Sequence, residues 1–395
     1  MYAYYDKERA RIPIKMWIPQ LKIEPGAWEQ LIHLANLPFA FSHIAVMPDT
    51  HQGYGMPIGA VLATEKVIIP NAVGVDIGCG MCAVKTPWKV NEVDIETTKK
   101  IMSKIRETVP VGFNHHKVIQ DKRLMPTWET HITVIDKEYQ AACYQLGTLG
   151  GGNHFIELQK DTDGFIWIML HSGSRNLGKK VADYYNRIAV ESNTKWFAYV
   201  PKEWELAFLP LDSKEGQDYL NEMKYCVDFA LANRKLMMER IAEAFNSTIN
   251  FKKINMAGLI NIAHNYAEME NHFGKNVMVH RKGATLVREG IVGIIPGSQG
   301  TKSYIVTGLG NPESFMSCSH GAGRKMGRGQ AQRELDLATE VKKLNDQGII
   351  HGIRSVNDLD EAAGAYKDID EVMENQKELV QISVELSPLA VIKGD

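Results

Sequence analysis

The sequence predicts a mixed α+β protein that forms one large domain over residues 1–395. Up to about residue 180, short apolar runs end at glycine or proline, which is typical of strands. Beyond that point, one long segment carries apolar residues at helical spacing, and strand patterns then return. No segment rich in proline, glycine and serine divides the chain, so a single domain is the simplest expectation.

The individual elements follow from these patterns in order along the chain. The apolar runs 43–48 and 165–170 have the length and ending of strands. Residues 216–245 predict a long helix, and residues 330–344 predict a second helix nearer the C-terminus. Residues 380–384 alternate between apolar and polar side chains, which predicts an edge strand.

Composition excludes several classes of protein. Hydrophobic residues make up 44% and charged residues 23% of the chain, which excludes a disordered or collagen-like protein. The 45 basic and 47 acidic side chains give a net charge of −2, so contact with nucleic acid must come from local patches. The apolar runs are too short to span a membrane, and the N-terminal residues are too polar for a signal peptide. With five scattered cysteines, we expect a cytoplasmic protein with reduced thiols.

The glycines are unusually placed. Many of the 33 lie in six short segments that also carry histidine, aspartate, asparagine or cysteine. Glycine allows backbone N–H groups to approach a ligand closely, and a run of such groups forms a concave anion site. We therefore expect one composite pocket for a phosphate-rich ligand. The six segments are 49–55, 74–80, 150–154, 171–175, 296–300 and 320–324.

Five side chains in or near these segments are candidate metal ligands. Each alone has an ordinary explanation, because single buried cysteines and histidines are common in protein cores. Together they favour a metal site, since Asp76 and Cys79 lie three residues apart on one turn and His171 ends an apolar strand. Five ligands exceed a closed tetrahedral site, whereas a shared thiolate would let them hold two ions, and this ligand chemistry favours zinc. The five are Asp76, Cys79, His154, His171 and His264.

A second reactive group is predicted at His320. This residue begins the glycine loop 320–324, which is followed by three basic side chains and no acidic one up to residue 333. A histidine in such a loop could attack an α-phosphorus and carry a nucleotide as a phosphoramidate. Its other ring nitrogen would then have to be held by a carboxylate or carbonyl, and Asp49 is the candidate.

Two further motifs suggest other chemistry, and both are weaker. Cys79 and Cys82 form a C-x-x-C pair, but strand-like sequence follows where a redox pair would lead into a helix. We therefore expect Cys82 in the core. Residues 173–180 nearly match a P-loop, yet Lys180 stands where the magnesium-binding hydroxyl is required. This segment could still contact phosphate through its backbone and Arg175.

Taken together, these segments resemble the RtcB family of GTP-dependent RNA ligases. The resemblance follows the family order through most of the chain. Departures from the family pattern are few: Gln299 stands where the family usually has methionine, and Leu286 where an arginine is common. The matching segments are 47–59, 73–81, 147–157, 171–175, 263–265, 280–285, 296–298, 320–324 and 393–394.

The resemblance implies an α+β fold of RtcB type with a deep pocket, lined by the glycine loops, for two Mn²⁺ ions and GTP. Cys79 would bridge the two ions. Asp76 and His154 would complete one metal site, and His171 and His264 would complete the other. On this basis manganese replaces zinc as the expected metal.

The resemblance also implies roles around the nucleotide. His320 would be the guanylylated nucleophile, and Asp49 would orient it. Glu157 and Lys393 would approach the guanine. The remaining residues expected around GTP are Asn153, His264, Asn265, Pro296, Gly297, Ser298, Gln299, Ser303, Gly321, Ala322 and Gly323.

The implied reaction joins an RNA 3′-phosphate or 2′,3′-cyclic phosphate end to a 5′-hydroxyl end, in tRNA splicing or RNA repair. It runs through a histidine–GMP intermediate and an activated RNA–ppG end. The expected partner is cleaved RNA, such as tRNA. No association with a membrane is expected. We expect a monomer, and an accessory activating protein is compatible with this function.

Two other functions are compatible with the residues. A metal-dependent phosphodiesterase that only opens cyclic phosphates on RNA ends would need the metal ligands but neither His320 nor GTP. A metal-bound RNA-binding module without activity would need no nucleophile, so the presence of His320, Asp49 and all five ligand types argues against it.

Overall fold

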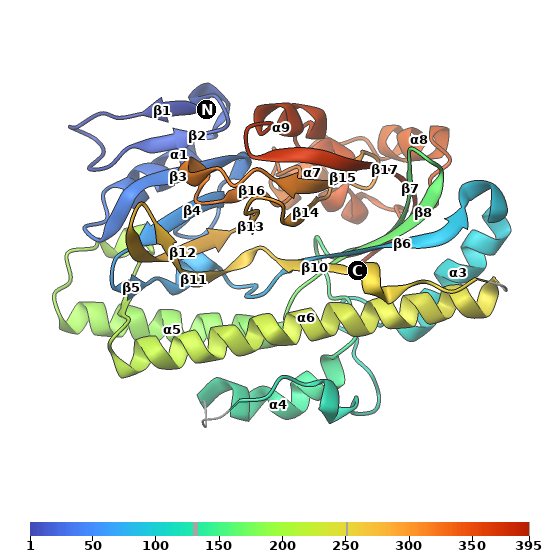
Figure 1. Cartoon of the computed structure of the whole chain (residues 1–395), viewed down its shortest axis with the longest axis horizontal. Helices are drawn as coiled ribbons and strands as arrows, with labels where there is room; N and C mark the ends of the chain where they lie inside the picture. The colour runs from blue at the N-terminus through green and yellow to red at the C-terminus, as the bar shows by residue number, and fades with distance from the viewer. Residues whose placement is uncertain (129–132, 250–251, 395) are drawn as a thin grey trace.

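The computed structural model describes residues 1–128, 133–249 and 252–394, and it is a mixed α+β structure built around two sheets (Figure 1). The first sheet has the strand order β1 (Tyr2–Tyr4), β2 (Ile14–Met16), β3 (Ala40–His51), β4 (Ile58–Thr64), β12 (Lys275–Lys282) and β11 (Asn265–His272). The second has the order β10 (Ile260–Ala263), β6 (Gly80–Lys89), β8 (Phe165–Ser172), β7 (Phe155–Asp161), β17 (Val380–Lys393), β15 (Ser303–Gly308) and β14 (Val292–Ile295).

Two small ladders complete the strands of the described chain. They pair β13 (Ala284–Leu286) with β16 (Ser317–Ser319), and β5 (Val67–Ile68) with β9 (Leu209–Pro210). The strand pairs described are antiparallel except β2 with β3, which is parallel. The expected strands 43–48 and 165–170 are confirmed as parts of β3 and β8.

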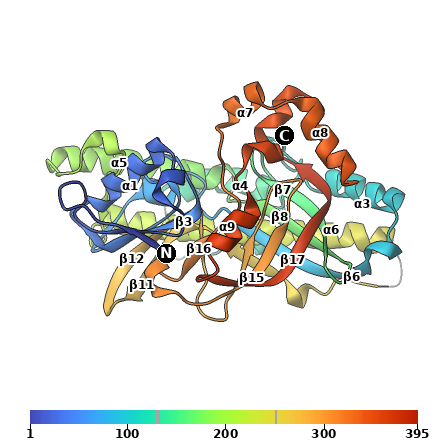
Figure 2. The ribbon, with the colours of Figure 1, turned by 90° about the horizontal axis from the view of Figure 1, so that it is seen from above.

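Helices lie on both sides of the sheets. In Figure 1, the long helices α5 and α6 run beneath the sheets, whereas α7, α8 and α9 lie above them, with α7 and α8 together at one side of the molecule (Figure 2). The α-helices are α1 (Pro25–Ala35), α2 (Pro70–Val73), α3 (Ile95–Thr108), α4 (Thr133–Gln145), α5 (Asn176–Lys195), α6 (Lys214–Thr248), α7 (Arg328–Glu334), α8 (Leu337–Asp346) and α9 (Ile369–Asn375). Short 3₁₀ turns occur at Gln20–Lys22, Val90–Glu92, Lys122–Leu124, Lys202–Trp204, Met256–Gly258, Pro312–Ser314, Val356–Glu361 and Ala363–Ala365.

The long helix expected from residue 216 is confirmed as α6, with 35 residues. Its N-terminus is capped by Ser213, whose Oγ accepts the N–H of Gly216 at 3.0 Å. Tyr219, Cys226 and Phe229 are fully buried on the face that packs towards α5 and the second sheet. Burial of this apolar face, rather than helix propensity, is what stabilises a helix of this kind.

Of two expectations for the C-terminal region, one is wrong in detail and the other is confirmed. The helix expected over residues 330–344 is two helices, because Asp336 leaves the helical conformation and accepts the N–H of Thr339 at 2.7 Å as the cap of α8. The edge strand expected over residues 380–384 is confirmed as the first part of β17, because these residues pair with β15 on one side only. The strand continues beyond them, and residues 386–393 pair with β7, so the later part of β17 lies inside the second sheet.

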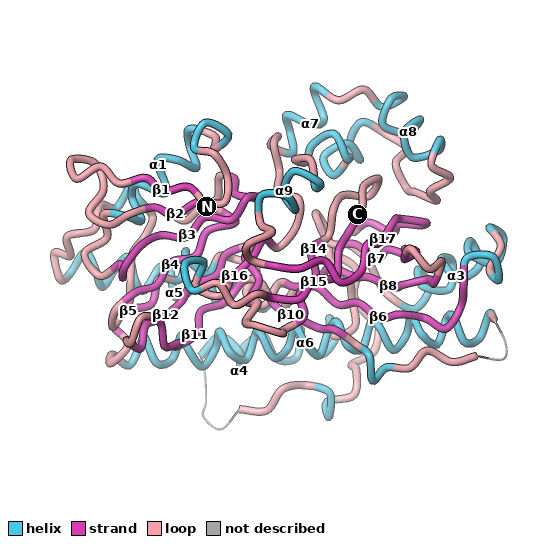
Figure 3. The backbone as a smooth tube through the Cα atoms, turned by 45° about the horizontal axis from the view of Figure 1, so that its top comes forward, coloured by secondary structure: helices cyan, strands magenta, loops and turns pink. Residues whose placement is uncertain are grey.

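The junction of the two sheets positions the candidate site. Strand β10 belongs to the second sheet and β11 to the first, and His264 is the single residue between them (Figure 3).

All five cysteines are buried and unpaired, which confirms Cys82 as a core residue. Within the described ranges, no helix has both the length and the apolar character needed to cross a membrane.

Candidate active site

A cavity of about 1710 Å³ lies where the glycine segments meet. Each of the six segments contributes residues to its lining, and residues 264–265 and 282–283 at the sheet junction line it too. Pockets for small ligands usually measure about 300–1,000 Å³, so this cavity has room for more than a nucleotide.

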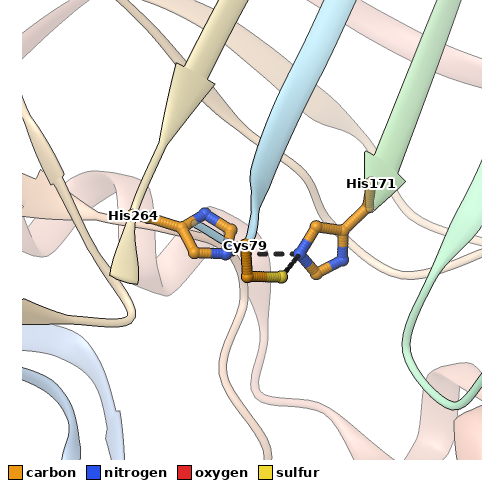
Figure 4. A group of neighbouring side chains, drawn as sticks. All are labelled: Cys79, His171 and His264. Carbon is orange, nitrogen blue, oxygen red and sulfur yellow. Dashed lines mark hydrogen bonds between the residues drawn. The ribbon is translucent and has the colours of Figure 1, made fainter. Parts of the chain in front are cut away.

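Three of the expected metal ligands converge from three strands of the second sheet. Cys79 directly precedes β6, His171 is in β8, and His264 follows β10 (Figure 4). Nε2 of His171 lies 3.1 Å from Sγ of Cys79 and 3.2 Å from Nε2 of His264. Because β6 pairs with both β8 and β10, strand pairing brings these three ligands together.

The same cysteine belongs to a second group of ligands. Nε2 of His154 lies 3.6 Å from Sγ of Cys79 and 3.2 Å from Oδ2 of Asp76. In each of the two groups, the ligand atoms lie within 4.8 Å of one another. Cys79 is therefore shared between two groups of three donors, which is the arrangement that a pair of bridged ions requires.

The imidazoles are oriented for ligation. Nδ1 of His154 donates to the carbonyl oxygen of Leu149 at 2.9 Å, and Nδ1 of His171 donates to that of Asn153 at 3.2 Å. These hydrogen bonds leave the Nε2 lone pairs directed at the cluster. Burial lowers the pKa of His171 well below its usual value, so the ring is neutral at pH 7.

The thiol of Cys79 needs a cation to ionise. Burial, and then the neighbouring Asp76, raise its pKa well above the usual value. A divalent cation bound to the sulfur would offset both effects and hold the thiolate. The donors present, one carboxylate, one cysteine sulfur and three imidazoles, fit two such metal ions.

His320 lies beside this cluster and is held by Asp49. Nδ1 of His320 donates to Oδ2 of Asp49 at 2.7 Å, and the backbone N–H of His320 donates to the same oxygen at 3.1 Å. Burial would raise the pKa of Asp49, but the hydrogen bond and charge of His320 bring it below the usual value. The ring centroid of His320 is 4.8 Å from that of His264. The contact expected between Asp49 and His320 is therefore present.

Most residues expected around a nucleotide line the cavity, and one does not. Ser303 is absent from the lining described; its buried Oγ instead accepts the N–H of Gly297 at 3.1 Å and supports that loop from behind. Burial raises the pKa of Glu157 to about 8. The residues that line the cavity are Asn153, Glu157, His264, Asn265, Pro296, Gly297, Ser298, Gln299, Gly321, Ala322, Gly323 and Lys393.

Two consecutive residues of α6 connect the ligand-bearing segments, and the sequence interpretation missed both. Oδ1 of Asn233 accepts the N–H groups of residues 147 and 148, and its Nδ2 donates to the carbonyl oxygen of Gly173. Arg234 donates to the carbonyl oxygens of Gly78 and Ser172, each at 2.8 Å. Both side chains are fully buried. A signal was available in the sequence. The two polar residues follow Ala230 and Leu231 by three residues, so they occupy positions where the helical pattern predicts apolar side chains.

Comparison with known proteins agrees with this geometry. A family model described as "tRNA-splicing ligase RtcB" matches residues 30–394. The chain belongs to the RtcB family. It is similar to the "RNA-splicing ligase RtcB" of Escherichia coli strain K12, with 38% identity over 405 residues that cover 97% of each chain.

More distant members of the RtcB family align over nearly the whole chain as well. The "tRNA-splicing ligase RtcB" of Thermococcus kodakarensis is 32% identical and covers 99% of this chain and 96% of the relative. The "RNA-splicing ligase RtcB homolog 1" of Entamoeba dispar is also 32% identical, over 94% of this chain and 82% of the relative. Membership in this family identifies the protein as an enzyme, an RNA ligase.

Proposed function

We propose that the chain is a GTP-dependent RNA ligase that joins an RNA 3′-phosphate or 2′,3′-cyclic phosphate end to a 5′-hydroxyl end. The observation that carries this proposal is the Asp49–His320 pair beside the Cys/His cluster. A phosphodiesterase that only opens cyclic phosphates has no need of such a nucleophile. The cellular role is tRNA splicing or RNA repair, with cleaved RNA as partner.

The two donor groups would hold two Mn²⁺ ions that share Cys79. Asp76 and His154 would serve one ion, and His171 and His264 the other. When bound, such ions polarise phosphoryl oxygens and stabilise the charge that develops during phosphoryl transfer. The protein holds the imidazoles in the ligating tautomer through the backbone carbonyls of Leu149 and Asn153.

His320 would supply the covalent step. Because Nδ1 carries the proton donated to Asp49, Nε2 keeps its lone pair and can attack the α-phosphorus of GTP. A bond from Nε2 to phosphorus forms, the bond to the β-phosphate oxygen breaks, and pyrophosphate leaves. Asp49 balances the positive charge that develops on the ring.

Two transfers would follow. An oxygen of the RNA 3′-phosphate attacks the phosphorus of the histidine–GMP, and the bond to Nε2 breaks to give the RNA–ppG end. The 5′-hydroxyl of the second RNA then attacks the RNA 3′-phosphorus, GMP leaves, and the strand is sealed. A cyclic phosphate would first be hydrolysed: water attacks its phosphorus, the bond to the 2′-oxygen breaks, and the 2′-oxygen takes up a proton to leave the 3′-phosphate.

The glycine loops and charged groups would hold GTP. Residues 297–299 and 321–323 line the cavity beside His320, and the backbone of the glycine loop 321–323 is suited to contact phosphate oxygens. Glu157 and Lys393 would contact the guanine.

The chain is proposed to act as one domain, because a single family match extends over residues 30–394 and the two sheets share the site. It is also proposed to act as a monomer. An accessory activating protein is compatible with this proposal.

The test is incubation with α-labelled GTP and Mn²⁺, followed by denaturing electrophoresis. Acid-labile, alkali-stable label on the wild type, lost in His320→Ala, is the expected result. His115→Ala is the matched control, because this histidine is exposed and is not among the cavity-lining residues described. If metal-loaded wild type takes up no label but opens cyclic phosphates, the phosphodiesterase is the correct function.

A further inference from the structure

One end of the cavity presents a fully exposed aromatic side chain. Phe113 lines the cavity and is 101% exposed, so nothing in the described chain covers its ring. Its backbone is nevertheless held in place. The N–H of the preceding Gly112 donates to Gly150 at 2.8 Å, and Arg175 donates to the carbonyl oxygen of Gly112 at 2.7 Å. The loop therefore presents an apolar ring to solvent from an anchored backbone.

The charges at this end suit a phosphate backbone. Phe113 follows Gly112, to which Arg175 is hydrogen-bonded, and the lining residues Asn176 and Lys179 follow Arg175 in α5. The carboxylate that acts on Arg175 is Asp76 of the metal-ligand group. Arg175 is the N-cap residue of α5 and Lys179 is in its first turn and a half, so both belong to the same end of the cavity as Gly112. Lys179 pairs with Asp183 at 2.5 Å, an exposed contact of the kind that contributes little.

A second exposed aromatic residue lies in a different electrostatic environment. Tyr54 is 71% exposed and also lines the cavity. The neighbouring Gly55 donates to Oε2 of Glu205 at 3.2 Å, and Gln52 donates to Glu24. One cation also lies here, because Nζ of the buried Lys282 donates to the carbonyl oxygen of Tyr54, but burial lowers the pKa of this lysine to about 7. Two carboxylates against this one weakened cation disfavour a phosphate backbone beside Tyr54, so the balance of charge favours the Phe113 end for an incoming nucleic-acid strand.

We propose that Phe113 is a base-stacking residue for single-stranded RNA that enters the cavity next to the glycine loop 150–154. This inference rests on the proposed function, since it identifies where that substrate is gripped. An exposed ring on an anchored loop loses little conformational freedom when a base covers it. Stacking is tolerant of base identity, so the contact would serve RNA ends of any sequence.

The experiment measures direct binding of a fluorescein-labelled RNA oligonucleotide with a 3′-phosphate to the full chain, by anisotropy, at several salt concentrations. The variants are Phe113→Ala, Phe113→Leu and Phe113→Trp. Phe197→Ala is the matched control, because Phe197 is 94% exposed and is not among the cavity-lining residues described. Guanylylation by GTP is measured in parallel to show that each variant keeps its site.

We expect Kd to rise about 5- to 100-fold in Phe113→Ala and Phe113→Leu, because stacking of one base is lost. Phe113→Trp retains a π-face and should bind like the wild type, as should Phe197→Ala. The salt slope should not change, since no phosphate contact is removed. An unchanged Kd in Phe113→Ala, or full binding by Phe113→Leu, would overturn the proposal. Because RNA binding is measured directly, a failure of the wild type to become guanylylated would count against the ligase proposal alone.

Discussion

Oδ2 of Asp49 accepts two hydrogen bonds from His320, one from Nδ1 at 2.7 Å and one from the backbone N–H at 3.1 Å. Asp49 is fully buried in β3, and His320 directly follows β16. One carboxylate oxygen thus sets both the tautomer of the ring and the backbone position of the residue that carries it.

We expect Asp49→Asn to slow formation of the covalent GMP adduct by about 10²- to 10⁴-fold, because an amide does not balance the charge of an imidazolium. Single-turnover labelling with GTP measures this rate. Metal content should be unaffected, since Asp49 is outside both ligand groups. A variant that labels at the wild-type rate would exclude the orienting role.

Cys79→Ala should remove both ions, because its sulfur is the donor common to the two groups. Asp76→Ala should weaken one site only, so the bound metal should fall from about two ions to about one per chain. Elemental analysis after gel filtration gives these ratios. Cys82→Ala is the control, since this cysteine is buried in the core. Equal metal loss in the Cys79 and Asp76 variants would contradict the shared thiolate.

Arg234→Met should weaken metal binding, although none of the hydrogen bonds described joins Arg234 to a ligand side chain. Without the guanidinium, the carbonyl oxygens of Gly78 and Ser172 lose a hydrogen-bond donor. These two residues directly precede Cys79 and follow His171, respectively, in the sequence. We expect a 10- to 100-fold weaker metal affinity, about the effect of other supporting residues at metal sites. Titration with Co²⁺, followed by the thiolate-to-metal absorption band, measures it. The exposed neighbour substitution Lys235→Met should leave the titration unchanged.

Gly323→Ala should disrupt the loop that carries His320. Gly323 has φ +73°, and a Cβ there would lie 2.1 Å from the carbonyl oxygen of Asp49. We expect guanylylation to be lost. If the loop moves to accommodate the methyl group, the free energy of unfolding should fall by about 1–3 kcal/mol. Gly327→Ala is the control in the same loop, because nothing lies within 4 Å of its Cβ position. Wild-type activity in Gly323→Ala would show that Asp49 can shift without consequence.

Glu157 predicts a pH dependence of stability. Burial raises its pKa from 4.5 to about 8, so the folded state keeps the proton over a range where the unfolded state loses it. Its contribution to stability is complete below pH 4.5 and is lost as pH rises through about 8. Glu157→Gln cannot ionise and should lose less stability than the wild type between pH 5 and about pH 8. Denaturant unfolding at several pH values measures the difference, and parallel curves for the two proteins would contradict the protonated state.

The sequence by itself determined the chemistry of the site and several elements around it. Glycine segments, ligand types and their spacing were sufficient to predict Asp76, Cys79, His154, His171 and His264 as one group of metal ligands, and these side chains do lie together. The same signals predict a nucleophilic role for His320, which lies beside Asp49. These signals are local, because a short segment with glycines and metal-binding side chains can be interpreted without the positions of residues far away in the sequence. The helix α6 was similarly accessible, since helical periodicity is a local property.

Only the tertiary structure decided which residues support that chemistry from a distance. Asn233 and Arg234 became functional candidates because α6 packs beneath the ligand-bearing strands, and Ser303 proved to support Gly297 rather than line the cavity. The interior position of residues 386–393 in β17 likewise depends on pairing with β7, a segment more than 200 residues earlier in the chain. Such contacts result from burial and hydrogen bonding across the whole fold, which no local pattern of residues encodes.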